Sequence, residues 1–136
     1  MSDVFVKRKF TFAASHRLHS NSLSDEENKI IYGKCNNPNG HGHNYTLIVT
    51  MKGSPDPTTG MFVNLTEVKA VLEETVGRQF DHKNLDLDTT YFADRPSTAE
   101  NIAIVIWDML KQSTLAEHLY SVEIIETENN SAVYYG

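Results

Sequence analysis

Residues 41–52 read HGHNYTLIVTMK, and apolar and polar side chains alternate along this stretch. The apolar residues of the alternation share one face: Tyr45, Leu47, Val49 and Met51. The polar residues share the other face: Asn44, Thr46, Thr50 and Lys52. A period of two residues is typical of a strand that buries one face and exposes the other. The stretch therefore predicts a half-buried strand, and His41 and His43 extend its buried face.

Further strands are expected near both ends of the chain. Residues 4–14 alternate in the same way, with an apolar face made of Val4, Val6, Phe10, Phe12 and Ala14. Residues 120–126 alternate again, and residues 132–135 form a last short run of strand-forming side chains. Between the two long strands, residues 24–27 (SDEE) form a capping box that predicts a short helix.

Two longer helices are expected between the strand pairs. Asn64 with Glu67 opens the first, apolar residues follow at helical spacing, and Gly77 is expected to end it. Ser97 with Glu100 opens the second in the same way. Strands at both ends of the chain with helices grouped between them predict an α+β fold, in which two helices cover one face of a four-stranded antiparallel sheet.

The composition excludes several classes of protein. The 136 residues include 12 Lys and Arg against 18 Asp and Glu, so a dominant basic surface for nucleic acid or anionic membranes is absent. No stretch approaches the ~18 consecutive apolar residues of a membrane span, and residues 1–4 lack the layout of a signal peptide. The single cysteine, Cys35, excludes an internal disulfide and fits a reducing compartment. We expect one domain over residues 1–136 in the cytoplasm, with no nucleic acid or membrane partner.

Three histidines share the phase of the two long apolar faces. His41 and His43 are two residues apart on one expected strand, and His16 continues the apolar face of the other. If the strands pair, the three imidazoles meet at one end of the sheet, where they would bind Zn²⁺ and leave it an open fourth position. The alternative is a set of ordinary hydrogen-bonded histidines. His19 and His118 lack this phasing and are interpreted as surface residues.

Cys35 lies six residues before His41 in a loop rich in Asn, Pro and Gly, and three interpretations remain open. It could be a fourth metal ligand in a structural site, although such sites usually recruit two or more thiolates. It could be a free thiol beside an open metal site, where a divalent cation favours the thiolate form that acts as a base or nucleophile. It could also be an inert buried cysteine.

Two further positions carry acidic groups with a possible catalytic use. Asp81 and His82 are neighbours in a loop, where an acid that hydrogen-bonds one imidazole nitrogen raises the basicity of the other. A polar pair at a helix end is the alternative. Glu126 shares the apolar face of residues 120–126, and a buried carboxylate must be paired or used. One use is a bidentate grip on an N–C–NH₂ edge of a heterocycle.

Several segments, in order along nearly the whole chain, closely resemble the 6-pyruvoyltetrahydropterin synthase family. They are ASHRL (14–18), GKCNNPNGHGHNY (33–45), the helix that begins at Leu65, FDHKNLD (80–86), STAEN (97–101) and Glu126 with Thr127. Five residues separate Cys35 from His41. This insert is similar to that of the animal-type enzymes and longer than is typical of the related 6-carboxytetrahydropterin synthase.

The resemblance implies the tunnelling fold, in which three subunits form a twelve-stranded barrel and two trimers form a homohexamer with active sites at subunit interfaces. It implies Zn²⁺ as the cofactor, held by His16, His41 and His43. Cys35 matches the catalytic base, and Asp81 with His82 matches a catalytic pair contributed by a neighbouring subunit.

For the substrate, Glu126 matches the carboxylate that anchors the pterin and counts among the catalytic residues. Two further residues lie in the segment that helps to hold the pterin ring: Thr98 and Glu100. The implied reaction converts 7,8-dihydroneopterin triphosphate into 6-pyruvoyltetrahydropterin by eliminating inorganic triphosphate, a lyase step of tetrahydrobiopterin biosynthesis. The candidates for holding the triphosphate are Arg17, Lys34 and Lys83. The alternatives are a 6-carboxytetrahydropterin synthase acting on the same substrate and a non-catalytic, zinc-stabilised pterin-binding protein.

Overall fold

The computed structural model describes residues 3–136, so Met1 and Ser2, with which the expected domain begins, lie outside the described residues. In chain order its elements are β1 (Val4–His16), α1 (Asp25–Tyr32), the 3-10 turn η1 (Gly33–Asn36), β2 (His41–Gly53), α2 (Leu65–Leu72), the π-helical segment η2 (Glu73–Gly77), α3 (Arg78–Phe80), β3 (Lys83–Asn84), α4 (Ala99–Lys111), β4 (Leu119–Thr127) and β5 (Asn130–Tyr134). The α+β class predicted from the sequence is confirmed.

A single five-stranded sheet with the order β3-β1-β2-β4-β5 forms the centre of the molecule. The two long strands β1 and β2 pair antiparallel over their whole length, from Val4 opposite Gly53 to His16 opposite His41. The pairs β2–β4 and β4–β5 are antiparallel as well. The prediction of a four-stranded, purely antiparallel sheet is wrong in one respect, because β3 runs parallel to the free edge of β1.

Backbone contacts to β1 explain this fifth strand. The amide of His82 donates to the carbonyl of Ala13 at 2.6 Å, and the amide of Leu85 donates to the carbonyl of Ser15 at 2.8 Å. The segment between them therefore lies along β1 as the two-residue strand β3. Two residues are too short to show a periodic hydrophobic pattern, so the sequence carries no signal for this strand.

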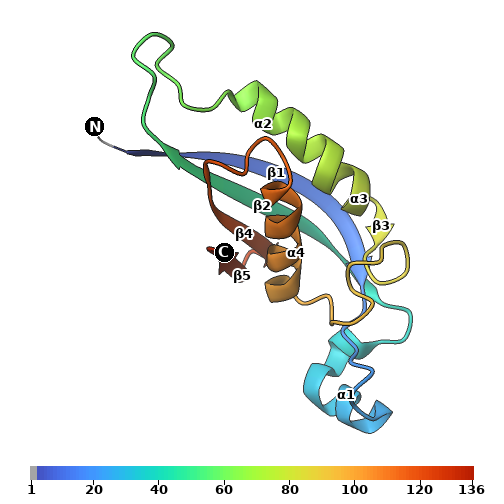
Figure 1. The fold of residues 1–136 in the computed structure, drawn as a ribbon. Helices are drawn as coiled ribbons and strands as arrows, with labels where there is room; N and C mark the ends of the chain where they lie inside the picture. Colours follow the sequence, from blue (N-terminus) through green and yellow to red (C-terminus); the bar gives the residue numbers. More distant parts are fainter. Residues whose placement is uncertain (1–2) are drawn as a thin grey trace.

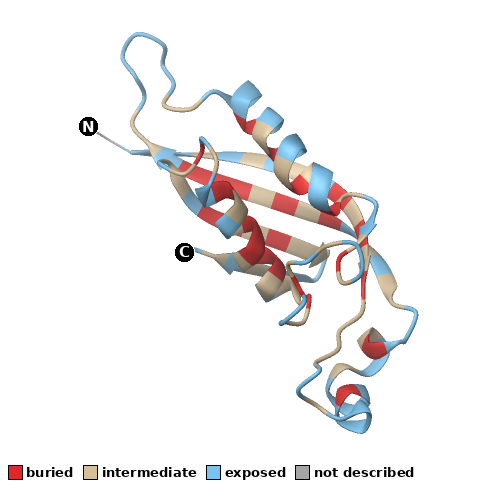
Figure 2. Ribbon diagram, turned by 45° about the vertical axis from the view of Figure 1, so that its right-hand side comes forward, coloured by how far each residue is buried: buried red, intermediate tan, exposed pale blue. Residues whose placement is uncertain are grey.

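Helices α2 and α4 cover the same face of the sheet, whereas α1 lies beyond the end of β1 and β2, outside this layer (Figure 1). The short helix predicted from the capping box is confirmed as α1, since Ser24 and Glu27 each bind the other's backbone amide, at 3.0 and 3.1 Å. Buried residues follow the strands in alternation and line the inner sides of the two helices (Figure 2). The core contains, among others, Phe12, Tyr45, Leu47, Val49, Val68, Leu72, Ile102, Ile106, Val122 and Ile124.

The sequence predicts that the first long helix ends near Gly77. The structure differs, because η2 and α3 continue the helical backbone to Phe80. Gly77 has an ordinary helical φ of −57°. A Cβ atom at this position would lie 3.1 Å from Cζ of Phe10. The glycine therefore allows the helix to pack closely against β1. Over residues 3–136, none of the helices combines the length and the apolar character that crossing a bilayer requires.

We predict that the core face of α4 carries much of the stability. Ile102 is fully buried in α4, whereas Ile30 in α1 is 81% exposed. Ile102→Ala should lower the free energy of unfolding by about 2–5 kcal/mol, because it removes buried methyl groups and leaves a cavity. The matched change Ile30→Ala should alter it by no more than about 0.5 kcal/mol. Chemical denaturation of both variants checks this, and equal losses would contradict the assignment of the core.

Candidate metal centre and active site

The three histidines grouped from the sequence lie together at one end of the sheet. The register places His16 opposite His41, and Ala14 opposite His43. One ligand nitrogen from each histidine lies within 4.8 Å of the other two. The ring centroids are 4.7 Å apart for His16 and His41, 5.2 Å for His16 and His43, and 4.9 Å for His41 and His43. The pairing of two strands thus brings distant parts of the chain into one cluster.

A hydrogen bond identifies which ring nitrogen of His16 carries the proton. Its Nδ1 lies 2.7 Å from the carbonyl oxygen of Ser97, and because a carbonyl only accepts, Nδ1 carries the proton. The lone pair is then on Nε2. A backbone carbonyl that fixes the tautomer of a histidine in this way is common around metal ligands. Oγ of Ser97 also lies 3.4 Å from Nδ1, so the residue that precedes the N-cap of α4 contacts His16 through both its backbone and its side chain.

The other two histidines leave buried polar atoms unpaired. Both ring nitrogens of His41 and Nε2 of His43 are buried and have no hydrogen-bond partner among residues 3–136. An unpaired buried polar atom costs roughly 1–3 kcal/mol, so it normally has a partner. A cation held by nitrogen lone pairs would satisfy these atoms. The residues present therefore fit a metal ion, and the donor set of imidazoles suits zinc among other transition metals.

Burial also favours the protonation state that a metal requires. Desolvation lowers the pKa of His16, and the nearby His41 and His43 lower it further against the opposing effect of the Ser97 carbonyl. Desolvation and then the charge of His43 lower the pKa of His41. The fold therefore favours the neutral imidazole, which is the form that donates a lone pair to a cation.

Glu126, at the end of β4, points to the same cluster. Its Oε2 lies 3.8 Å from Nε2 of His16, and its side chain is 20% exposed. Beneath both residues, the hydroxyl of the fully buried Tyr45 lies 3.4 Å from each ring nitrogen of His16. Burial raises the pKa of Tyr45, and the negative charges of Glu126, Asp86 and Cys35 raise it further.

Cys35 occupies the turn η1 and is half-buried. Its carbonyl accepts a hydrogen bond of 2.9 Å from the amide of Leu18, two residues after His16 in the chain. Within residues 3–136, the group of side chains close enough together to hold a metal comprises the three histidines without Cys35. The thiol is free, half-buried and outside that group, so among the described residues it is neither a member of the histidine cluster nor a fully buried cysteine.

Asp81 and His82 lie elsewhere, at the β3 edge of the sheet. Asp81 Oδ1 accepts from the amide of Ala13 at 3.0 Å, and Asp81 Oδ2 lies 3.1 Å from Nδ1 of His82. The hydrogen bond from Ala13 lowers the pKa of Asp81, and the contact with His82 lowers it further. His82 is 83% exposed and has a φ of 63°, the left-handed region that residues other than glycine seldom adopt. The pair thus presents an oriented imidazole to the outside.

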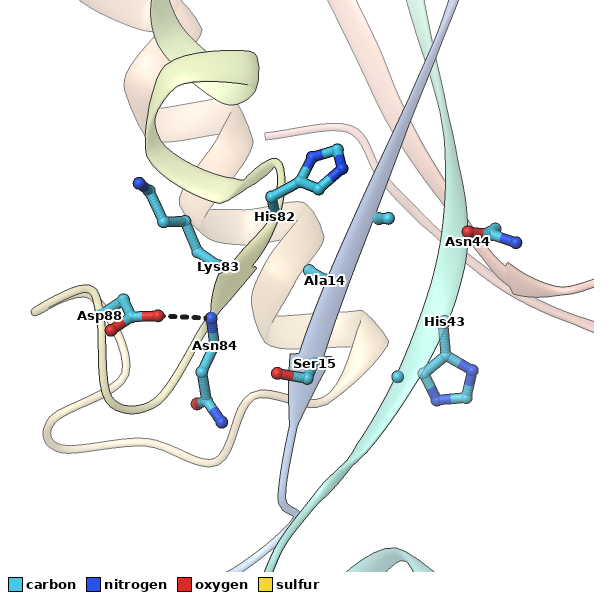
Figure 3. Close-up of a pocket in the computed structure, with 10 residues that line it drawn as sticks. Ala14, Ser15, His43, Asn44, His82, Lys83, Asn84 and Asp88 are labelled. Carbon is cyan, nitrogen blue, oxygen red and sulfur yellow. Dashed lines mark hydrogen bonds between the residues drawn. The ribbon is translucent and has the colours of Figure 1, made fainter.

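An open hollow of about 570 Å³ lies beside this pair and is lined by Ser15, His43, Asn44, His82 and Lys83, among others. In Figure 3 the ring of His82, in the turn before β3, and the ring of His43, in β2, do not point toward one another. The structure therefore brings the three histidines and Glu126 together within one chain. It does not bring Asp81 and His82 into the same cluster.

Two residues expected to help hold a pterin ring lie at the start of α4. Thr98 is the N-cap, and its Oγ1 accepts from the amide of Asn101 at 3.2 Å. Glu100 is exposed in the first turn.

Sequence reasoning missed Asn36, a buried amide in the Cys35 loop that makes several hydrogen bonds. A buried polar residue in an Asn-rich loop has no distinguishing local signal. His19, interpreted as a surface residue, is half-buried beside it.

Comparison with known proteins identifies relatives over almost the whole chain. The model of the family described as 6-pyruvoyl tetrahydropterin synthase matches residues 5–136. The 6-pyruvoyl tetrahydrobiopterin synthase of Homo sapiens is 54% identical over 131 residues, which cover 96% of this chain and 90% of the relative. That of Drosophila melanogaster is 51% identical and is covered over 79% of its length, against 97% of this chain.

Solved structures agree with these matches. The structure of the Caenorhabditis elegans 6-pyruvoyl tetrahydropterin synthase superposes with a TM-score of 0.96 at 45% identity, covering 100% of this chain and 97% of that one. The 6-pyruvoyl tetrahydropterin synthase of Plasmodium falciparum superposes with a TM-score of 0.67 at 18% identity, covering 100% and 99%, and this likeness concerns the fold alone.

We predict that the histidine cluster binds a transition metal. His41→Ala should sharply reduce the metal content of the purified protein, because it removes one of three nitrogen ligands. His118→Ala is the matched control, since His118 contacts the carbonyl of Lys52 near the opposite end of β2. Elemental analysis of both variants measures the metal bound per protein chain. Full metal content in His41→Ala would show that the cluster is not the site.

Proposed function

The chain belongs to the 6-pyruvoyl tetrahydropterin synthase family and is an enzyme of that family, and from this premise we propose that it is a zinc-dependent lyase. Its single domain would convert 7,8-dihydroneopterin triphosphate into 6-pyruvoyltetrahydropterin and release inorganic triphosphate, as a step of tetrahydrobiopterin synthesis. The observation that carries the proposal is the cluster of three histidines with ligand atoms within 4.8 Å of one another.

In this proposal His16, His41 and His43 hold the zinc ion. Bound there, zinc would polarise hydroxyl groups on the side chain of the substrate and stabilise the negative charge that develops on it. The carbonyl of Ser97 keeps Nε2 of His16 available as a ligand. The unpaired nitrogens of His41 and His43 support the assignment, since a bound cation would satisfy them.

Glu126 and Cys35 take the roles nearest to this centre. The carboxylate of Glu126, beside His16 and partly exposed, would grip the N–C–NH₂ edge of the pterin through two hydrogen bonds. Thr98 and Glu100, at the start of α4, would border the ring. Cys35 would act as the general base that removes a proton from the first carbon of the substrate side chain. Two observations support this role: Cys35 lies outside the group of metal-ligand candidates, and its carbonyl is bonded to Leu18, two residues after His16.

Asp81 and His82 would complete the site of a neighbouring subunit in a homohexamer of two trimers. Within one chain His82 points outward at the sheet edge, and Asp81 holds its Nδ1 so that Nε2 can exchange protons. The edge strands β3 and β5 leave the sheet open on both sides, and pairing of such edges between subunits would close it into a barrel. A shared active site would explain why the oriented imidazole of His82 is 83% exposed in the single chain.

The reaction and the base are tested together. Incubation with 7,8-dihydroneopterin triphosphate should release inorganic triphosphate and yield 6-pyruvoyltetrahydropterin, identified by mass spectrometry. Cys35→Ala should keep its zinc and lower turnover by about 10²–10⁴-fold, the usual contribution of a positioned base. Zinc lost together with the sulfur would make Cys35 a ligand. The 6-carboxy product would identify the protein as the carboxytetrahydropterin synthase instead.

Mixing two inactive variants tests the shared site. Cys35→Ala and His82→Ala should each be inactive as homo-oligomers. When they are co-expressed and purified as mixed oligomers, about a quarter of the sites should combine an intact Cys35 with an intact His82 from another subunit. Turnover should therefore recover to about that fraction of wild type. A mixture without activity, or active protein that is monomeric by light scattering, would contradict the interface site.

A further inference from the structure

Asn36, the residue after Cys35, is buried with 3% of its surface exposed, although it lies in a loop. Its Nδ2 donates to the carbonyl of Leu18 at 2.7 Å and to Nδ1 of His19 at 3.0 Å. A buried amide that uses both of its N–H groups is strongly constrained, because each unmade bond would cost desolvation energy. The Asn36 side chain is therefore fixed to the segment that follows β1.

Arg17 binds the same residue from the other side. Its Nε donates to the carbonyl of Asn36 at 2.9 Å, and its Nη2 lies 3.5 Å from Oδ1 of Asn36. The amide of Arg17 is held in turn by Asp86 Oδ2 at 2.7 Å. The guanidinium group, a candidate for holding the triphosphate from the sequence alone, thus faces Asn36 with two of its nitrogens.

These contacts join two parts of the proposed active site. Arg17, Leu18 and His19 directly follow the metal-ligand candidate His16, and Leu18 also donates its amide to the carbonyl of Cys35. The loop that carries the thiol is therefore fixed by five hydrogen bonds to the three residues that follow His16. Relative movement of Cys35 and His16 would break several of these bonds together.

We propose that Asn36, supported by Arg17, is a positioning residue that holds the thiol of Cys35 at a fixed place beside the histidine cluster. The inference rests on the proposed role of Cys35 as the base. A base acts only within hydrogen-bond reach of the proton it removes, and a displacement of about 1 Å can cost roughly 10²-fold in rate. Asn36 itself does not need to touch the substrate.

Asn36→Asp is the sharpest test, because it keeps the shape of the side chain, replaces the donor NH₂ with an acceptor oxygen and adds a negative charge. A carboxylate oxygen would then lie against the carbonyl of Leu18, so the loop should shift. We expect kcat to fall by about 10–100-fold, with KM and zinc content nearly unchanged. Asn21→Asp makes the same chemical change at an exposed position of the preceding loop and should leave kcat unchanged.

A double-mutant cycle distinguishes positioning from general damage. If Asn36 acts through the thiol, adding Asn36→Asp to Cys35→Ala should cause no further loss of the residual turnover. Because Cys35 is the only cysteine in the chain, its alkylation by iodoacetamide can be followed directly by mass. Alkylation should be several-fold faster in Asn36→Asp than in wild type or Asn21→Asp, because a shifted loop would expose the half-buried thiol to the reagent.

Arg17→Met provides a second variant should Asn36→Asp fail to fold, because it removes the guanidinium donors and keeps most of the aliphatic stem. The same lowered kcat and the same absence of further loss in the Cys35→Ala background are expected. Full kcat in the Asn36 and Arg17 variants, or additive losses in the cycle, would overturn the positioning role. Wild-type turnover in Cys35→Ala would instead overturn the proposed function, so the two failures are distinguishable.

Discussion

The antiparallel register between β1 and β2 determines where the residues of the candidate site lie. It sets His16 opposite His41, and it directs both side chains, together with that of His43, to the face that the helices cover. A shift of one residue would turn each of these side chains to the opposite face of its strand. The apolar residues along the same two strands prevent such a shift, because it would expose the core. The stability of the sheet and the geometry of the histidine cluster thus depend on the same alternation of apolar residues along β1 and β2.

The long elements and the histidine cluster could be predicted because their signals are periodic. Alternation over many residues identifies the strands, and three in-phase histidines follow from it. The rest depends on contacts that leave no such trace. β3 has two residues and exists through backbone hydrogen bonds to β1, and the shortest contact of Ser97 with His16 comes from its backbone carbonyl. Gly77 is typical of a helix end in sequence, whereas in the structure it lies within the helical segment and lets the backbone pack closely against Phe10.

Burial has two opposing effects on the histidine cluster. Burial favours neutral imidazoles, yet it also leaves nitrogens of His41 and His43 without partners. Glu126 and the hydroxyl of Tyr45 both place an oxygen atom within 4 Å of the ring of His16. Each of these groups has a cost when buried that a cation and a polar ligand would offset. The side chains of the site are therefore positioned before a ligand binds. Packing of the surrounding core offsets the unfavourable free energy of burying these polar groups.

The left-handed backbone at His82 has a consequence for engineering. A residue other than glycine or asparagine pays roughly 1–2 kcal/mol for this conformation, and an exposed imidazole recovers little of it through packing. A library screened for thermal stability alone would enrich glycine or asparagine at this position and still yield well-folded protein. Selection for heat resistance would then act against the proposed role of His82 in proton transfer, so thermostable variants of this fold need a simultaneous screen for turnover.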